Sequence, residues 1–155
     1  MEIERKFLVK QLPADLEAWP VRRIEQAYLC TRPVLRVRRS GERYFFTYKS
    51  EGLLAREEHE FPLEEEAYRH LLAKADGAVI SKDRYCIPLG PYTIELDVFA
   101  PPFAPLVLAE VEFPSEEEAA AFQPPAWFGE DVTCRPEFTN AALSRLGRAP
   151  SDTSY

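Results

Sequence analysis

The chain has 155 residues, of which 46% are hydrophobic and 29% are charged, and this composition predicts one soluble domain with a sizeable core. Its formal net charge of −7 argues against binding along a nucleic-acid backbone, although it is compatible with a local basic pocket. No window approaches the roughly 20 apolar residues that span a bilayer, and the acidic N-terminus enters a strand at once instead of forming a signal peptide. We therefore expect a cytoplasmic protein with neither nucleic-acid nor membrane partners, in which Cys30, Cys86 and Cys134 are reduced thiols.

The segment Met1–Phe7 predicts a strand with two unlike faces. Because successive side chains of a strand point to opposite sides, Glu2, Glu4 and Lys6 share one face, whereas Ile3 lies on the other. A single strand of this kind usually exposes its charged face to water. The same alternation recurs, however, in later segments: 35–39, 45–49, 56–61, 82–85, 94–98 and 109–113.

Between these segments the sequence predicts further elements in the first half of the chain. A strand is expected at 22–29, and Ser40–Glu42 is typical of a hairpin turn between the two strands that follow. A helix is expected to begin at Pro62 and to end at Gly77, because apolar residues recur there at helical spacing.

The second half of the chain is predicted to end with helices. Ser115 opens one of them, since a glutamate follows three residues later as in a capping box. A short strand is expected at 132–133, and a last helix at 139–146. No internal repeat and no second domain are visible, so residues 1–147 are interpreted as one domain and residues 148–155 as a disordered tail.

The charged faces of the strands are best accommodated inside a closed sheet. Acidic pairs such as Glu95 and Asp97 occur on different strands from most basic pairs such as Arg36 and Arg38. Like charges two residues apart repel each other, and exposed ion pairs stabilise a surface only slightly. A closed sheet would bring acidic strands opposite basic strands across a lumen, with helices covering its apolar outer face. The alternative is an open sheet with salt-bridged outer faces.

The predicted lumen combines two kinds of charged side chain. The carboxylates expected there are Glu2, Glu4, Glu58, Glu60, Glu95, Asp97, Glu110 and Glu112. The cations expected beside them are Lys6, Arg36, Arg38, Lys49, Arg56, Lys82 and Arg84. Clustered carboxylates suit Mg²⁺ or Mn²⁺, and clustered arginine and lysine suit a polyanion. The combination is what phosphoryl transfer requires.

The N-terminal segment also resembles a family signature. Glu2-Ile3-Glu4-Arg5-Lys6 matches the E-x-E-x-K signature of the CYTH family, the triphosphate tunnel metalloenzymes. Further similarities follow in family order at Gln26–Leu29, Arg36–Arg38, Lys49, Arg56–Glu60, Lys82–Tyr85, Glu95–Phe99, Ala109–Phe113 and Val132–Thr133. The resemblance covers about residues 2–146. It implies a mainly β (α+β) fold, a closed eight-stranded antiparallel β-barrel that forms a tunnel, with helices packed outside.

The same resemblance implies a site that binds a triphosphate together with Mg²⁺ or Mn²⁺. Its catalytic residues would be Glu2, Glu4 and Lys6. Its metal ligands would be Glu2, Glu4, Glu60, Asp97, Glu110 and Glu112. Its substrate contacts would be Lys6, Arg36, Arg38, Lys49, Arg56, Lys82, Arg84 and Tyr28. For Tyr28, packing in the barrel wall is the alternative interpretation.

Members of this family differ in their chemistry, and the sequence favours hydrolysis of inorganic triphosphate to diphosphate and phosphate. The chain is short and starts at the signature, like the simple bacterial triphosphatases. The alternatives are a class IV-type adenylate cyclase, a thiamine triphosphatase, and a non-catalytic polyphosphate- or nucleotide-binding module. Because binding alone needs only the cations, the carboxylates of Glu110 and Glu112 favour an enzyme. We expect a small-molecule triphosphate as the partner of a monomer or a homodimer.

Overall fold

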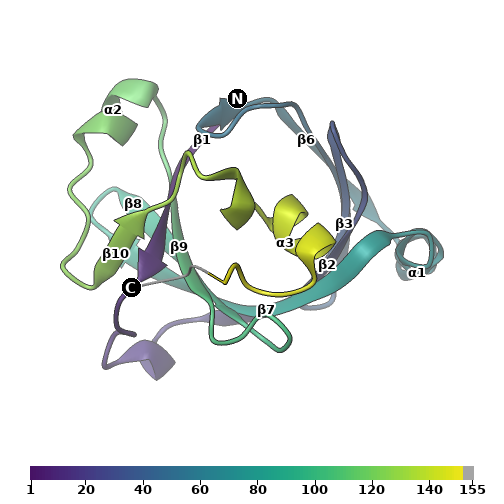
Figure 1. Ribbon diagram of the computed structural model, residues 1–155, viewed down its shortest axis with the longest axis horizontal. Helices are drawn as coiled ribbons and strands as arrows, with labels where there is room; N and C mark the ends of the chain where they lie inside the picture. Colours follow the sequence, from purple (N-terminus) through teal and green to yellow (C-terminus); the bar gives the residue numbers. More distant parts are fainter. Residues whose placement is uncertain (152–155) are drawn as a thin grey trace.

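The computed structural model describes residues 1–151, which form an antiparallel β-sheet with three α-helices and two 3₁₀ turns (Figure 1). The strands are β1 (Glu2–Val9), β2 (Val21–Thr31), β3 (Val34–Ser40), β4 (Arg43–Lys49), β5 (Ala55–Arg56), β6 (Glu58–Leu63), β7 (Asp76–Leu89), β8 (Tyr92–Phe99), β9 (Val107–Glu112) and β10 (Phe128–Asp131). The helices are α1 (Glu65–Leu72), α2 (Glu116–Ala121) and α3 (Asn140–Leu146), and the 3₁₀ turns are η1 (Leu16–Ala18) and η2 (Pro136–Phe138).

The strands surround a central space, and the predicted antiparallel barrel architecture is confirmed (Figure 1). Hydrogen-bonded neighbours follow the order β10-β1-β9-β8-β7-β2-β3-β4-β6, and β5 pairs with β1. Within residues 1–151 the hydrogen bonds do not close the ring continuously, and the sheet has ten strands where eight were predicted. One reason is that Glu57 leaves the ladder, donating its N–H to Ser50 Oγ at 2.8 Å, so that the strand predicted there divides into β5 and β6.

Alternation along the strands separates a charged inner face from an apolar outer face. On the inner face the register places Lys6 opposite Glu110 and Gln26 opposite Arg38. The outer apolar cluster, near α2 and β10, comprises Ile3, Phe7, Ile94, Leu96, Val111, Phe113, Phe122 and Phe128. Helix α1 covers a separate part of the outer face. Burial of each such side chain stabilises the fold by roughly 1.5–3 kcal/mol, so the outer face supplies much of the core.

One end of the barrel interior is filled by apolar side chains. This interior apolar cluster comprises Leu8, Tyr28, Ile80, Phe99, Phe103, Leu106, Leu108, Val132, Phe138 and Leu143. Phe138 belongs to η2 and Leu143 to α3, and α3 lies within the ring of strands in Figure 1. Helices α1 and α2 lie outside the barrel as predicted, but α3 closes one end of its interior because the apolar inward positions there need a cover.

Local sequence signals define α3 and its close approach to β7. Thr139 Oγ1 accepts a hydrogen bond from the N–H of Ala142, and Gly147 ends the helix with a φ of +77°. Gly77 in β7 has a φ of +81°, and a Cβ on it would lie 2.8 Å from the carbonyl oxygen of Ser144. A side chain at position 77 would therefore displace α3 as well as strain the backbone.

Three predicted boundaries are wrong. Pro62 does not begin a helix but lies in β6, the last strand of the sheet order, where its missing N–H can face away from the neighbouring strand. Helix α1 starts at Glu65, and Gly77 does not end it, since the helix stops at Leu72. The strand expected at 132–133 is shifted to β10, although Val132 N still donates to Lys6 O at 2.8 Å.

The C-terminal region is described only in part. Residues 148–151 of the predicted tail are described, and Ala149 packs against the interior apolar cluster. The disorder predicted for residues 152–155 lies outside the described residues. Among the described helices, none has both the length and the apolar character required to cross a membrane.

Candidate functional site

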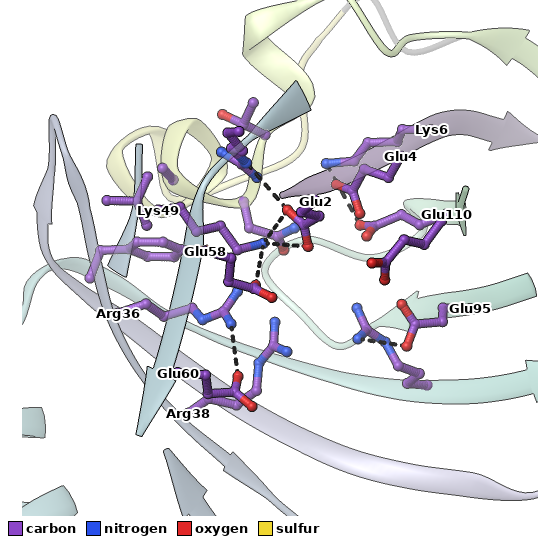
Figure 2. A pocket seen from close by; sticks show the side chains of 18 residues that line it. Glu2, Glu4, Lys6, Arg36, Arg38, Lys49, Glu58, Glu60, Glu95 and Glu110 are labelled. Carbon is purple, nitrogen blue, oxygen red and sulfur yellow. Dashed lines mark hydrogen bonds and ion pairs between the residues drawn. The ribbon is translucent and has the colours of Figure 1, made fainter. Parts of the chain in front are cut away.

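A cavity of about 170 Å³ occupies the charged end of the barrel interior. Figure 2 shows carboxylate and cationic side chains converging on it from several strands. Of the predicted site residues, only Lys82 and Asp97 do not line this cavity, and both are fully buried behind its wall. The additional lining residues are Val34, Glu58, Glu95, Thr139, Asn140 and Ala141.

Glu2, the first residue of β1, contacts two cationic side chains. Lys49 Nζ lies 3.1 Å from Glu2 Oε1 and 3.3 Å from Glu58 Oε2 (Figure 2). Arg56 Nε lies 3.4 Å from Glu2 Oε1. Burial opposes ionisation of Glu2, but the neighbouring Lys49 and Arg56 outweigh it and hold the pKa of Glu2 below its ordinary value. Glu2 is therefore an ionised carboxylate whose charge is already balanced.

Glu110 is held in a similar way by Lys6. Lys6 Nζ lies 3.7 Å from Glu110 Oε1 and donates a hydrogen bond of 3.1 Å to the carbonyl of Phe138. Burial opposes ionisation of Glu110, but Lys6 and Arg84 outweigh it and hold its pKa well below the usual range. Lys6 thus connects the charged wall to the turn that closes the other end.

Glu4 and Glu112 form a contrasting pair. They lie directly opposite each other on β1 and β9, and within residues 1–151 neither forms an ion pair with a lysine or arginine. Burial and the charge of Glu110 raise the pKa of Glu4 to about 8. Burial and the carboxylates of Glu2 and Glu58 raise the pKa of Glu112. This side of the cavity therefore gathers carboxyl groups that no ion pair within residues 1–151 neutralises, so that the protonated form of Glu4 is favoured in the ligand-free protein.

A buried ionic triad, defined as Lys82, Arg84 and Asp97, forms part of the cavity wall, with Arg84 lining the cavity and the other two residues behind it. Lys82 Nζ lies 2.7 Å from Asp97 Oδ2, and Arg84 donates to the same carboxylate through Nε at 2.7 Å and Nη2 at 2.9 Å. Burial opposes the charge of Asp97, but Arg84 and Lys82 outweigh it and lower its pKa. Lys82 also donates to Asn140 Oδ1 at 3.1 Å, which ties the triad to the start of α3.

Two arginines on β3 line the opposite side of the cavity. Arg36 Nη2 donates to Thr47 Oγ1 at 3.2 Å and lies 3.9 Å from Glu60 Oε2. Arg36 Nε is the one buried side-chain nitrogen or oxygen in residues 1–151 that has no hydrogen-bond partner. An unpartnered buried donor beside a cavity fits an anionic ligand that would accept from it.

Arg38, two residues further along β3, is similarly short of negative partners. Its Nε donates to Gln26 Oε1 at 2.8 Å, and Gln26 Nε2 donates to the hydroxyl of Tyr28 at 3.1 Å. Burial, together with the charges of Arg36 and Arg84, lowers the pKa of Arg38 to about 9. The β3 side of the cavity therefore has an excess of positive charge.

Several residues that line or adjoin the cavity were not predicted as site residues, and the sequence pointed to some of them more clearly than to others. Glu58 and Glu95 were expected on the inner face but were not assigned a role, and Gln26 shares a face with Tyr28 by simple alternation. Thr139 and Asn140 gave no such signal, because they reach the cavity from a helix far along the chain.

The carboxylates of the cavity are divided between two environments. Within residues 1–151, no three acidic, histidine or cysteine side chains are already gathered closely enough to hold an ion. The division has a visible cause, since Glu2 and Glu110 are turned to cations whereas Glu4 and Glu112 are not. Hard carboxylate oxygens from neighbouring strands nevertheless provide the donor type that a divalent cation prefers.

Comparisons with known proteins agree with this geometry. The family described as "CYTH domain" matches residues 1–135. The chain is 46% identical over 149 residues to an inorganic triphosphatase of Nitrosomonas europaea, covering 92% of this chain and 96% of the relative. It is 33% identical over 148 residues to an inorganic triphosphatase of Acetivibrio thermocellus, covering 92% of each. A crystal structure of an inorganic triphosphatase superposes with a TM-score of 0.69 and 40% identity, covering 93% of this chain and 94% of that one.

Proposed function

This chain belongs to the CYTH domain family, and we propose that it hydrolyses inorganic triphosphate to diphosphate and phosphate with the help of Mg²⁺ or Mn²⁺. The observation that carries the proposal is that one cavity holds arginines short of anionic partners on its β3 side, and two carboxyl groups without an ion-pair partner in residues 1–151 where β1 meets β9. The cationic side includes the unpartnered Nε of Arg36, and the acidic side includes the opposed Glu4 and Glu112. The two similar relatives named inorganic triphosphatase support the same activity.

The cations of the cavity would bind and orient the phosphoryl groups. Arg36 and Arg38 offer planar guanidinium groups that can donate two parallel hydrogen bonds to one phosphoryl group. Lys6, Lys49 and Arg56 line the same cavity and add positive charge from β1, β4 and β5. Ordinary hydrogen bonds to a charged group contribute about 1.5–3 kcal/mol each, so several together hold a triphosphate in one orientation.

Two members of the buried ionic triad would act from behind the cavity wall. Arg84 lines the cavity, whereas Lys82 and Asp97 are fully buried and hold Arg84 in place. The oxygens of Asp97 already accept from both cations, so we assign Asp97 the role of a counter-ion instead of a metal ligand. Lys82 would contribute positive potential without direct contact with the substrate.

The acidic side would hold the divalent metal. Glu4 and Glu112 are the central candidates because neither forms an ion pair within residues 1–151, and burial and other nearby carboxylates raise the pKa of each. Glu2 and Glu110 border them, and Glu60 lies across the cavity beside Arg36. When bound, such a metal neutralises charge on the phosphoryl oxygens and lowers the pKa of water.

The shape of the cavity favours a small anion over a nucleotide. The lining is mostly charged, and its uncharged residues are Tyr28, Val34, Thr139, Asn140 and Ala141. The interior apolar cluster closes the other end, so a nucleoside could not extend through the barrel. We therefore propose that inorganic triphosphate is hydrolysed faster than ATP or thiamine triphosphate, because contacts with phosphate dominate the lining.

One assay separates the candidate functions. Phosphate release and cyclic AMP formation would be measured with inorganic triphosphate, ATP and thiamine triphosphate, each with Mg²⁺ and with Mn²⁺. We expect fast phosphate release from inorganic triphosphate and little from the others. Cyclic AMP formation without triphosphate hydrolysis would identify a cyclase, and preferred release from thiamine triphosphate would identify that substrate. Tight triphosphate binding without any turnover would identify a binding module.

A further inference from the structure

Gln26 is a buried amide that touches two cavity residues without lining the cavity itself. Its side chain is inaccessible to solvent, and it lies on the inner face of β2, between β3 and β7. Arg38 and Tyr28, its two hydrogen-bond partners, both line the cavity. A fully buried glutamine in a central strand is held by its neighbours, so it can fix the orientation of both partners.

The chemistry of the partners determines which way the amide faces. The guanidinium of Arg38 can only donate, so the atom 2.8 Å from its Nε must be the amide oxygen of Gln26. The amide nitrogen therefore faces the hydroxyl of Tyr28, at 3.1 Å. Because an amide nitrogen can only donate, the oxygen of Tyr28 must accept this hydrogen bond.

This arrangement leaves the hydroxyl proton of Tyr28 available to a ligand. Since the oxygen accepts from Gln26, the proton must point in another direction, and no acceptor for it is found among residues 1–151. Tyr28 lines the cavity proposed to bind triphosphate. Arg38 is directed in the same way, since only its Nε is engaged by Gln26 and its terminal nitrogens are left for other acceptors.

We propose that Gln26 is a positioning residue that presents the hydroxyl of Tyr28 as a hydrogen-bond donor, and the guanidinium of Arg38 as a fork, to the phosphoryl oxygens of the substrate. This inference rests on the proposed function, because it takes triphosphate as the ligand of the cavity. It assigns a role to the polarity of the amide and not only to its shape. The two ends of Gln26 must be different, one an acceptor and one a donor.

The Gln26→Glu variant tests this polarity at nearly constant shape. Its carboxylate would still accept from Arg38, but it cannot donate to Tyr28, so the hydroxyl would turn its proton away from the cavity and onto the carboxylate. We expect kcat/KM for inorganic triphosphate with Mg²⁺ to fall about 10- to 100-fold, the effect of losing a hydrogen bond to a charged group. The Gln26→Met variant, which removes both hydrogen bonds, should lose less.

If Gln26 had only a structural role, Gln26→Met would lower kcat/KM more than Gln26→Glu. The carboxylate would then form an ion pair with Arg38 and serve better than methionine. Melting temperatures of both variants show whether each is folded. Gln123→Glu, at an exposed position, is the matched control and should leave kcat/KM unchanged.

A double-mutant cycle separates proton orientation from the added negative charge. The charge repels triphosphate whether or not Tyr28 carries a hydroxyl. We expect Tyr28→Phe alone to lower kcat/KM about 10-fold or more, and Gln26→Glu to cost several-fold less in the Tyr28→Phe background than in the wild type.

Several outcomes would overturn the inference. If the Tyr28→Phe variant had the same kcat/KM as the wild type, the inference would be wrong, even if the Gln26 variants failed to fold. If Gln26→Glu lowered kcat/KM equally in the wild type and in the Tyr28→Phe background, the inference would also be wrong, but the triphosphatase proposal would be unaffected. Wild-type protein that neither binds nor hydrolyses inorganic triphosphate would overturn the proposed function, and this inference with it.

Discussion

The two ends of the barrel interior are built from the same strands but differ in what they contain. At the cavity end, the inward positions are carboxylates, lysines and arginines. On five strands, the next inward position toward the other end is apolar; these residues are Leu8, Val34, Ile80, Phe99 and Leu108. The apolar end is covered by η2 and α3, whereas the charged end lines the cavity.

The difference shows how one sheet divides stability and function along its length. At the apolar end, burial stabilises the fold and leaves no room for a ligand. At the charged end, Glu4 and Arg38 have pKa values shifted toward their neutral forms, which means that placing their charges there destabilises the ligand-free protein. Substitutions at the two ends should therefore separate the free energy of unfolding from activity.

The largest effect is expected from Leu143→Ala at the apolar end. Leu143 is fully buried in α3, so truncation should lower the free energy of unfolding by about 2–5 kcal/mol. For a chain of this size, each kcal/mol lowers the melting temperature by roughly 2–4 °C. Thermal melting gives the loss, and kcat/KM measured well below the transition should stay close to that of the wild type.

The control for this prediction lies on the same helix. Leu146 is 45% exposed, so Leu146→Ala should change the melting temperature little. A large loss of kcat/KM in fully folded Leu143→Ala protein would mean that the apolar end also takes part in the reaction.

Glu112→Gln should have the next largest effect, at the charged end. If Glu112 holds the metal, its loss should lower metal-dependent turnover by about 100-fold or more, since even residues that only orient metal ligands contribute 10- to 100-fold. The metal-free variant should be as stable as the wild type or more so, because the pKa of Glu112 is raised by burial and by neighbouring carboxylates.

Two melting curves and one activity assay test this prediction. The rise in melting temperature on adding Mg²⁺ should shrink in Glu112→Gln, since stabilisation by a ligand follows its affinity for the folded state. Glu117→Gln, at an exposed position of α2, serves as the control. An active variant with an unchanged metal-induced shift would remove Glu112 from the site.

Arg36→Ala should have a smaller but clear effect on catalysis. Losing a charge-assisted contact should lower kcat/KM for triphosphate about 10- to 100-fold. Arg36→Lys should recover part of this loss, because it restores the charge but not the two-pronged geometry. Arg23→Ala on the outer face, where Arg23 pairs with Asp83, should have no effect on kinetics. Equal kinetics for all three variants would mean that Arg36 does not contact the substrate.

The faces of the strands could be predicted from the sequence because alternation is a local property. Glu2, Glu4 and Lys6 line the cavity together, as their two-residue spacing indicated. The change from charged to apolar residues along the same face is also visible in the sequence, at positions such as Leu8 and Leu108. Its reason becomes clear only in the structure, where α3 packs over these apolar positions.

The remaining errors concern contacts between distant residues. Lys82 and Asp97 share the inward face, yet both are covered, and Lys82 bonds to Asn140 from 58 residues away. No periodicity reports such a contact, since it depends on where a helix packs. Similarly, Pro62 favours a helix start by local preference, but its place in the outermost strand of the sheet order makes an extended conformation equally acceptable.

The smallest effect concerns Glu4 and the pH dependence of stability without metal. In the unfolded chain this carboxyl ionises near its ordinary pKa of 4.5, whereas in the folded protein its pKa is about 8. Between these values the folded state binds more protons than the unfolded state, so stability falls as pH rises. Below the ordinary pKa both states are protonated and the contribution disappears.

Glu4→Gln should therefore reduce this loss of stability. In chelator-treated protein, the melting temperatures of wild type and variant should be similar near pH 5, and the variant should melt a few degrees higher at pH 8. Other titrating groups, such as Lys82 with its lowered pKa, are present in both proteins, so the difference between the two curves isolates Glu4. Glu117→Gln should follow the wild-type curve. Parallel curves for wild type and Glu4→Gln from pH 5 to pH 8 would mean that Glu4 is ionised throughout, and that its charge is already balanced within the ligand-free cavity.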